Sequence, residues 1–310
     1  MHMKLYKYIG PDVIELAFSE AGYVGFKCSY PKDYNDPYEL FLTIDPHEVE
    51  PEILAYYQEI LGAIPQLPTT CFSNLPNVIP MWAHYACNSK GFVIEVDEEA
   101  LLNIIPDISI ADVDYKDEAN VVDLDLVRHA YETGKSRHTY LLQRAAFSNA
   151  YFTKNICWSY ESERRLIIKD SDVKKIEDLM VLSVPTDCVT AIISGHRSEE
   201  ELKKRCREIC KSISSEYYEM LIGKSSIIPF FINTSKKSFL FNGHILVEAD
   251  NYCEDCGEPI NSEDVFKCNW CTIDETQKIE AASKNPMRLL AKYGLLKDYV
   301  KACAKIRKES

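Results

Sequence analysis

The stretch WSYESERRLII, residues 158–168, ends in an apolar run that predicts a strand beginning at Arg164. Glu161 and Glu163 stand two positions apart before this run, a spacing that puts both side chains on one face of an extended chain. Taken alone, the two acids favour a solvated strand edge, and a pair of catalytic carboxylates is the alternative. One of the two arginines, Arg164 or Arg165, is expected to brace Glu163.

Short strands and amphipathic helices are expected on both sides of this stretch. The expected strands cover residues 4–9, 22–28, 69–73, 91–97, 189–194, 227–232 and 238–248. The expected helices cover residues 48–61, two segments between 118 and 152, and a segment from an N-cap at Ser198 to about Leu221. This order predicts an α+β fold, a mainly β body with helical insertions, spanning residues 1–249. A small separate module is expected over residues 250–310.

The composition is typical of a globular protein, with 46% hydrophobic and 27% charged residues in a chain of 310. The chain contains no run of about eighteen apolar residues, so neither a transmembrane helix nor a membrane partner is expected. The N-terminal residues lack the apolar core of a signal peptide, which predicts a cytoplasmic location. In that compartment the twelve cysteines should be reduced thiols or metal ligands.

Charge is distributed unevenly along the chain, whose net charge is −13. Residues 284–310 carry eight Lys or Arg against two acids, a charge of +6, which leaves −19 on residues 1–283. The acidic body argues against a broad nucleic-acid-binding surface there, whereas the basic tail permits one.

The module begins with two cysteine pairs, Cys253-x2-Cys256 and Cys268-x2-Cys271, separated by eleven residues. Two such pairs bring four thiolates to the corners of a tetrahedron, as in structural Zn²⁺ sites that leave no open coordination position. The alternative is four unrelated buried cysteines. Zinc ribbons bind nucleic acid and protein about equally often, so the motif does not identify a partner.

The last segment of the chain predicts a helix with one basic stripe and one apolar side. The stripe contains Lys297, Lys301, Lys305 and Lys308, and the apolar side contains Leu296, Tyr299, Val300, Cys303 and Ile306. One interpretation is a terminal helix docked by its apolar side with a solvated outer face. The other is a stripe that lies along a phosphate backbone or an acidic partner.

Five motifs in the body occur together and in a fixed order. They are LYKY (5–8), NDPYE (35–39), CFS (71–73), MWAHYA followed by GFVIEV (81–96), and WSYESERRL (158–166). In this order they resemble domain-of-unknown-function family 2971, over roughly residues 4–245. That family in turn resembles the ADP-ribosyltransferase-like superfamily, in which two small antiparallel sheets flank a cleft that binds NAD.

The resemblance implies a role for each candidate site residue. It implies that Lys7 holds the ribose or phosphate of NAD, that Ser73 braces the cleft, and that Tyr85 stacks on nicotinamide. It makes Glu163 the catalytic acid. The second carboxylate, Glu161, is placed to take the proton from an attacking acceptor. The remaining NAD-binding candidates are Tyr8 and His84.

The chemistry fits these residue types. Cleavage of an N-glycosidic bond passes through a cationic, oxocarbenium-like state that a fixed carboxylate stabilises. The first-strand residue is Lys7 where well-known branches have Arg or His, and Ser73 stands without a Ser-Thr-Ser motif. The alternatives are that Lys7 is a strand-edge charge and that His84 is structural.

The leading hypothesis is a mono-ADP-ribosyltransferase that transfers ADP-ribose from NAD to RNA, DNA or protein. The resemblance permits a toxin or antiphage defence effector with a cognate antitoxin or inhibitor protein. One alternative is a non-catalytic protein that binds nucleic acid or a partner through the ribbon and basic tail. The other is an NAD glycohydrolase, in which water replaces the acceptor.

Overall fold

The computed structural model describes residues 3–34, 36, 49–105, 108–117, 124–176, 178–261 and 265–309. The NDPYE motif, apart from Asp36, therefore lies outside the described residues. The chain divides into two compact units, Met1–Glu248 and Ala249–Ser310. In the described part of the chain, none of the helices has the length and apolar character needed to cross a bilayer.

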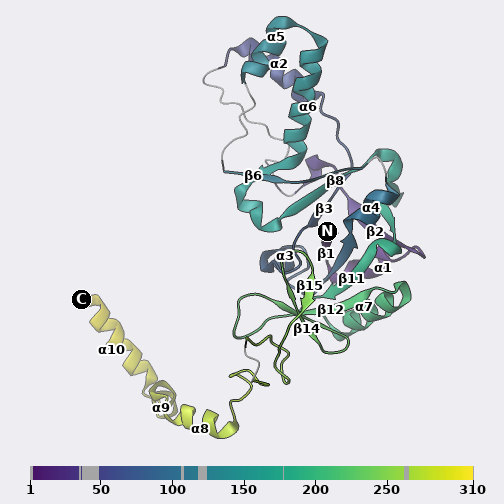
Figure 1. Ribbon diagram of the computed structural model, residues 1–310. Helices are drawn as coiled ribbons and strands as arrows, with labels where there is room; N and C mark the ends of the chain where they lie inside the picture. The colour runs from purple at the N-terminus through teal and green to yellow at the C-terminus, as the bar shows by residue number, and fades with distance from the viewer. Residues whose placement is uncertain are drawn as a thin grey trace. The chain divides into compact units, whose positions relative to one another are not determined.

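The larger unit is built on a ten-stranded sheet (Figure 1). Its strands are β1 (Lys4–Ile9), β3 (Thr69–Ser73), β4 (Phe92–Asp97), β5 (Ser109–Asp112), β8 (Glu163–Ile167), β11 (Val189–Ser194), β12 (Glu216–Leu221), β13 (Phe230–Asn233), β14 (Ser238–Phe241) and β15 (Leu246–Glu248). Their order is β15-β14-β13-β12-β11-β4-β1-β3-β8-β5. Neighbours are antiparallel except β11 and β12, which are parallel and are joined by helix α7 (Glu200–Ile213). A helical crossover is the usual way to connect parallel neighbours.

Two smaller sheets accompany it. One contains β2 (Tyr23–Cys28), β10 (Leu179–Pro185) and β9 (Lys174–Ile176), and the other pairs β6 (Asp114–Lys116) with β7 (Thr153–Asn155). The mixed α+β class is therefore confirmed. Among the described residues the main sheet is a single large one that contains a parallel pair, and the expected arrangement of two small antiparallel sheets around a cleft is not confirmed.

The core lies on both faces of the large sheet because its central strands alternate their side chains. On β1, Leu5 packs with Val24 and Phe26 of the three-stranded sheet. Tyr6 and Tyr8 point to the other face and pack with the cluster that contains buried Trp82. Trp82 belongs to α3 (Ile79–His84), and its indole donates to the Pro76 carbonyl at 2.8 Å.

A helical layer occupies one end of the unit, around a core of its own (Figure 1). It contains α2 (Pro51–Gly62), α5 (Leu124–Thr133) and α6 (Ser136–Phe152), whose buried apolar residues cluster with Ile167 of β8. The two short helices α1 (Ile14–Ala17) and α4 (Glu98–Ile104) lie elsewhere on the unit. The helices expected over residues 48–61 and between 118 and 152 are confirmed where they are described.

The helix predicted from Ser198 to Leu221 is wrong at both ends. Ser214 has a φ of 57°, a left-handed conformation that ends α7, and the chain then enters β12. Glu199 occupies the N-cap position. The Ser198 hydroxyl instead donates to the carbonyls of Lys90 and Gly91, which ties the start of α7 to the turn before β4.

The smaller unit contains α8 (Glu275–Ser283), α9 (Pro286–Lys292) and α10 (Leu296–Glu309). Neither α8 nor α9 buries a side chain. Among its described residues the buried side chains are Cys253, Glu258 and Cys268. This unit therefore lacks an apolar core of ordinary size in its described part.

Candidate functional site

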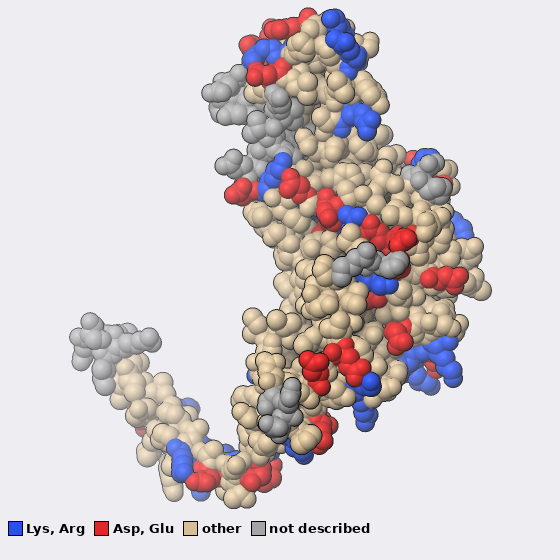
Figure 2. All heavy atoms as spheres, viewed as in Figure 1, with Lys and Arg blue, Asp and Glu red and all other residues tan. Residues whose placement is uncertain are grey.

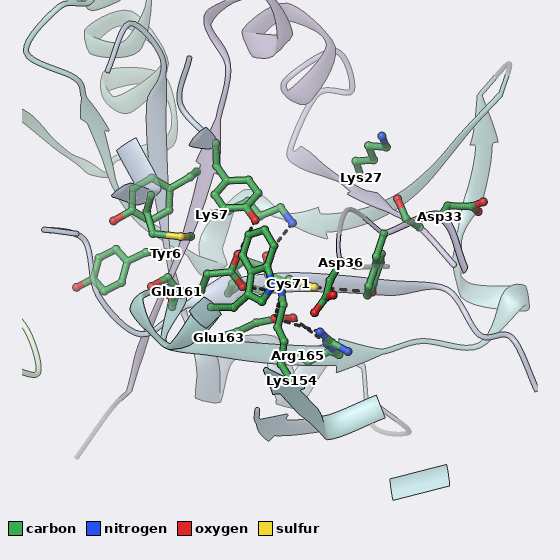
Figure 3. A pocket seen from close by; sticks show the side chains of 18 residues that line it. Tyr6, Lys7, Lys27, Asp33, Asp36, Cys71, Lys154, Glu161, Glu163 and Arg165 are labelled. Carbon is green, nitrogen blue, oxygen red and sulfur yellow. Dashed lines mark hydrogen bonds and ion pairs between the residues drawn. The ribbon is translucent and has the colours of Figure 1, made fainter. Parts of the chain in front are cut away.

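A pocket with a volume of about 240 Å³ opens where the large sheet is nearly divided (Figure 3). Strand β1 pairs with β4 through six residues, but with β3 through one pair alone, Tyr6 opposite Ser73. Because the ladder between β1 and β3 is so short, side chains of both strands reach the gap. The lining residues come from β1, β2, the segment that follows β2, β3, α3, β7, the 3₁₀ helix η4 (Ile156–Glu161), and β8.

The pocket brings together six of the seven residues predicted to be catalytic or to bind NAD. These are Lys7, Tyr8, Ser73, Tyr85, Glu161 and Glu163. His84 is exposed at the end of α3, with its ring centroid 6.2 Å from that of Tyr160, and is not among the described lining residues. The carboxylates are buried, so a solvated strand edge is the wrong interpretation of this stretch.

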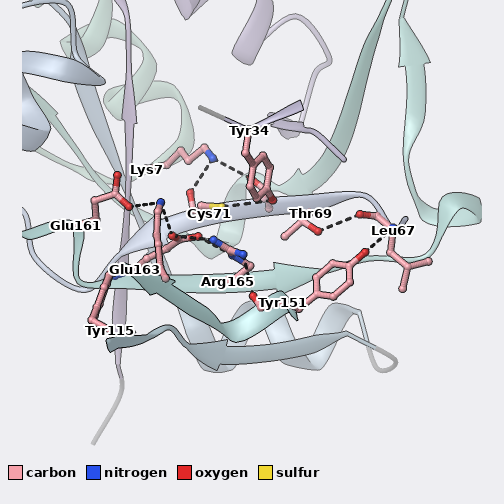
Figure 4. A network of polar contacts seen from close by, with 12 residues as sticks. Lys7, Tyr34, Leu67, Thr69, Cys71, Tyr115, Tyr151, Glu161, Glu163 and Arg165 are labelled. Atoms are coloured by element: carbon pink, nitrogen blue, oxygen red, sulfur yellow. Dashed lines mark hydrogen bonds and ion pairs between the residues drawn. The ribbon is translucent and has the colours of Figure 1, made fainter. Parts of the chain in front are cut away.

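Glu163 is held by two cations. Its Oε1 accepts from Arg165 Nε at 2.7 Å and its Oε2 accepts from Arg165 Nη2 at 3.0 Å, a bidentate pair (Figure 4). Lys154 Nζ lies 3.3 Å from the same Oε2. Burial alone would raise the pKa of Glu163, but the charges of Arg165 and Lys154 outweigh it and hold the pKa at about 2. Glu163 is therefore an ionised carboxylate at neutral pH.

The expectation that an arginine braces Glu163 is thus confirmed for Arg165. Its side chain is fully buried, and Nη1 also donates to the Tyr151 carbonyl at 2.8 Å. Arg164 points the other way, because successive strand residues alternate faces, and pairs with Glu98 at 2.6 Å.

Glu161 does not lie on the strand, contrary to the prediction, yet it reaches the same pocket. It ends η4, and Ser162 then adopts a left-handed conformation with a φ of 43° and a ψ of 53° before β8 begins. This reversal turns the chain between the two acids. Glu161 Oε2 consequently accepts from Lys154 at 2.6 Å, and its Oε1 accepts from the Tyr85 hydroxyl at 2.5 Å.

Ser162 should be sensitive to the shape of its side chain rather than to its polarity. A β-branched residue disfavours the left-handed region, so Ser162→Val should lower the free energy of unfolding by about 1–2 kcal/mol. Ser162→Gly should leave it unchanged within about 0.5 kcal/mol, because glycine adopts this conformation freely. Urea unfolding of the two variants and the wild type measures both values. Equal losses for Val and Gly would show that the hydroxyl, not the backbone, matters here.

Lys7 bridges the gap between β1 and β3. Its ammonium donates to Thr70 Oγ1 at 2.9 Å and to the Cys71 carbonyl at 2.7 Å, where a longer ladder would place a backbone donor. Burial lowers the pKa of Lys7. Burial also raises the pKa of the nearby Cys71 thiol to about 12, and the Glu163 charge adds to this rise. The thiol is therefore a poor nucleophile in this state.

Ser73 and Tyr8 hold the walls of the pocket. The Ser73 hydroxyl donates to the Glu161 carbonyl at 2.7 Å and accepts from the Leu75 amide at 3.1 Å. The Tyr8 hydroxyl donates to the Leu75 carbonyl at 2.8 Å. Ser73 thus fixes the backbone of Glu161, as a bracing residue would.

Sequence reasoning missed two residues that contact the acids, of which Lys154 lines the pocket. Lys154 comes from β7, outside the large sheet, and contacts both acids. Tyr115 comes from β6, and its hydroxyl accepts a hydrogen bond from the Glu163 amide at 2.8 Å. The only signal for Lys154 was its place in the polar segment before Trp158, and Tyr115 gave none.

The four cysteines of the smaller unit lie together. Their Sγ atoms are all within 4.8 Å of one another, and those of Cys256 and Cys268 are 3.7 Å apart. Zn–S bonds of about 2.3 Å at tetrahedral angles separate two sulfurs by about 3.8 Å. The set could therefore hold a metal ion and is compatible with zinc.

Comparison with known proteins covers part of the body. Residues 81–166 match the model of a family described as "Protein of unknown function (DUF2971)". No curated protein and no solved structure matches the chain. The match contains Tyr85, Glu161 and Glu163, whereas Lys7 and Ser73 lie before it. The resemblance expected over residues 4–245 is thus shown for residues 81–166, the segment that carries both acids.

Proposed function

We propose that the pocket cleaves the glycosidic bond of NAD and transfers ADP-ribose to a macromolecular acceptor. The observation that carries this proposal is the convergence of Glu161 and Glu163 on one buried ammonium, that of Lys154. Two fixed acids beside an aromatic hydroxyl suit a reaction whose transition state gains positive charge on a sugar.

The charges around the pocket also suit NAD, which carries a cationic ring and an anionic pyrophosphate. Among the described residues, the lining contains four basic and four acidic side chains. They are Lys7, Lys27, Lys154 and Arg165, and Asp33, Asp36, Glu161 and Glu163. In Figure 3, Lys7 and Lys27 lie on one side of the pocket, and Glu163 and Arg165 lie on the other. A ligand with charges of both signs matches such a lining better than one of a single sign.

In the proposed reaction the bond between the ribose anomeric carbon and the ring nitrogen breaks, and its electron pair leaves with neutral nicotinamide. Glu163 stabilises the positive charge that develops on the sugar. The acceptor nucleophile then bonds to the anomeric carbon, and its proton passes to Glu161. Tyr85 orients Glu161 through their hydrogen bond.

Removal of the Glu163 charge should abolish most of this activity. Glu163→Gln keeps the shape of the side chain and should slow nicotinamide release by about 100-fold or more, the usual effect of losing one stabilising group at a reacting centre. Nicotinamide release and transfer of labelled ADP-ribose in cell lysate measure the effect. Glu98→Gln is the control, because Glu98 is also a buried acid paired with an arginine but lies outside the pocket.

The outcomes separate the possible functions. Free ADP-ribose without a labelled macromolecule would show a glycohydrolase. Equal nicotinamide release by the wild type and Glu163→Gln, or none by the wild type, would count against catalysis at this pocket. Salt-sensitive binding of RNA or DNA without NAD cleavage would favour a binding role for the smaller unit.

A further inference from the structure

The ammonium of Lys154 lies in an enclosure made by acids and an aromatic ring. It is 2.6 Å from Glu161 Oε2 and 3.3 Å from Glu163 Oε2, and it stands 4.9 Å from the centre of the Trp158 ring. The Lys154 side chain is 8% exposed, so these contacts are largely removed from water. Trp158 lines the pocket. Lys154, Glu161 and Glu163 line it as well (Figure 3).

This combination of contacts is one that binds organic cations. A desolvated cation gains about 2 kcal/mol or more from an aromatic face, and carboxylates add charge-assisted attraction. The Tyr85 hydroxyl fixes one carboxylate, and Arg165 and the Tyr115 hydroxyl fix the other residue. The enclosure is therefore held by neighbours that do not depend on Lys154 alone.

We propose that Lys154 occupies a subsite for the cationic ring of a pyridinium ligand, which must displace the lysine in order to bind. The inference deepens the proposed function and rests on it for the choice of ligand. It differs from the role expected of Tyr85, since the subsite is made by Trp158 and the two acids. Lys154 thereby acts as an internal competitor for the ligand.

Charge balance explains why the two cations exclude each other. Arg165 neutralises Glu163 through its bidentate pair, so one further positive charge balances Glu161. Two unit charges about 4 Å apart repel by about 4 kcal/mol at an effective dielectric constant of 20. A ring in the subsite would therefore drive the flexible lysine side chain out of it.

Replacement of Lys154 by an uncharged residue tests the proposal by calorimetry. Lys154→Met should bind the N-methylnicotinamide cation about tenfold more tightly than the wild type, because the subsite is no longer occupied by the protein. Neutral nicotinamide should gain much less. Lys174→Met is the matched control, since Lys174 also pairs with an acid, Glu20, and lies 5.7 Å from the ring of Tyr23, but is 54% exposed and outside the pocket.

A second measurement keeps the test independent of how Lys154→Met folds. In the wild type, saturating N-methylnicotinamide should raise the labelling of Lys154 by an amine-reactive reagent, quantified by mass spectrometry, and leave Lys174 unchanged. Equal or weaker cation binding by folded Lys154→Met, or unchanged labelling of Lys154, would overturn the proposal. NAD cleavage without any effect of N-methylnicotinamide on these measurements would overturn the proposed subsite but not the proposed function. Cation binding with no NAD cleavage would overturn the proposed function alone.

Discussion

Loss of one thiolate from the four-cysteine cluster should unfold the smaller unit while the larger unit keeps its stability. We expect Cys253→Ser to lose equimolar zinc and to make residues 249–310 sensitive to protease. In this unit the described buried residues are two of the cysteines and Glu258, so little apolar burial is present to replace the metal. Structural zinc contributes about 10–16 kcal/mol of apparent binding free energy in small domains, more than such a unit gains from packing.

Metal analysis and limited proteolysis of the full chain measure this effect. Cys303→Ser is the control, because Cys303 is exposed on α10 of the same unit and outside the cluster. Chelation of the wild type should reproduce the Cys253→Ser pattern, and returning zinc should reverse it. Unchanged metal content and protease resistance in Cys253→Ser would show that Cys253 is not a ligand of a structural metal ion.

Much of the fold follows from local patterns in the sequence. The strand expected over residues 4–9 is β1, and its alternation puts Leu5 in one core cluster and Tyr6 and Tyr8 in another. The error over residues 214–221 arose because KSISSEYYEML continues with residues acceptable to a helix. The left-handed conformation of Ser214 ends the helix, and pairing with β11 and β13 makes the residues after it a strand. Such pairing is a tertiary interaction, so it cannot be predicted from the local sequence alone.

The sequence predicted which residues belong to the site, but it did not predict how they contact one another. The motifs identified Glu161 and Glu163, but period-two spacing predicted a shared strand face, whereas Ser162 reverses the chain. Figure 2 shows acidic and basic side chains interspersed on the visible face of the larger unit. The distribution of charged residues therefore did not indicate where the pocket lies. The short ladder between β1 and β3 leaves the gap in which the pocket lies. The length of this ladder depends on the register of strands that are far apart in the sequence.

The two consecutive arginines of the ERRL segment should differ greatly in their effect on stability. Arg165 is fully buried and pairs with Glu163, whereas Arg164 is 14% exposed and pairs with Glu98 and with Asp112, itself 60% exposed. Removal of one partner from a buried pair leaves an uncompensated charge and costs about 3–5 kcal/mol. We therefore expect Arg165→Met to lower the free energy of unfolding by this amount at neutral pH. Arg164→Met should cost about 1–2 kcal/mol, because part of its pairing is screened by water.

The pH dependence of stability should distinguish the two variants further. The pKa of Glu163 is about 2 in the folded protein against an ordinary 4.5, so its ionisation stabilises the fold fully above pH 4.5. This contribution, on the order of 3 kcal/mol, is lost as the pH falls toward 2. Arg165→Met removes the main cause of the low pKa and should flatten this part of the profile, whereas Arg164→Met should retain it. Urea unfolding across this pH range measures both profiles. A profile in Arg165→Met as steep as the wild type's would show that Lys154 alone keeps Glu163 ionised.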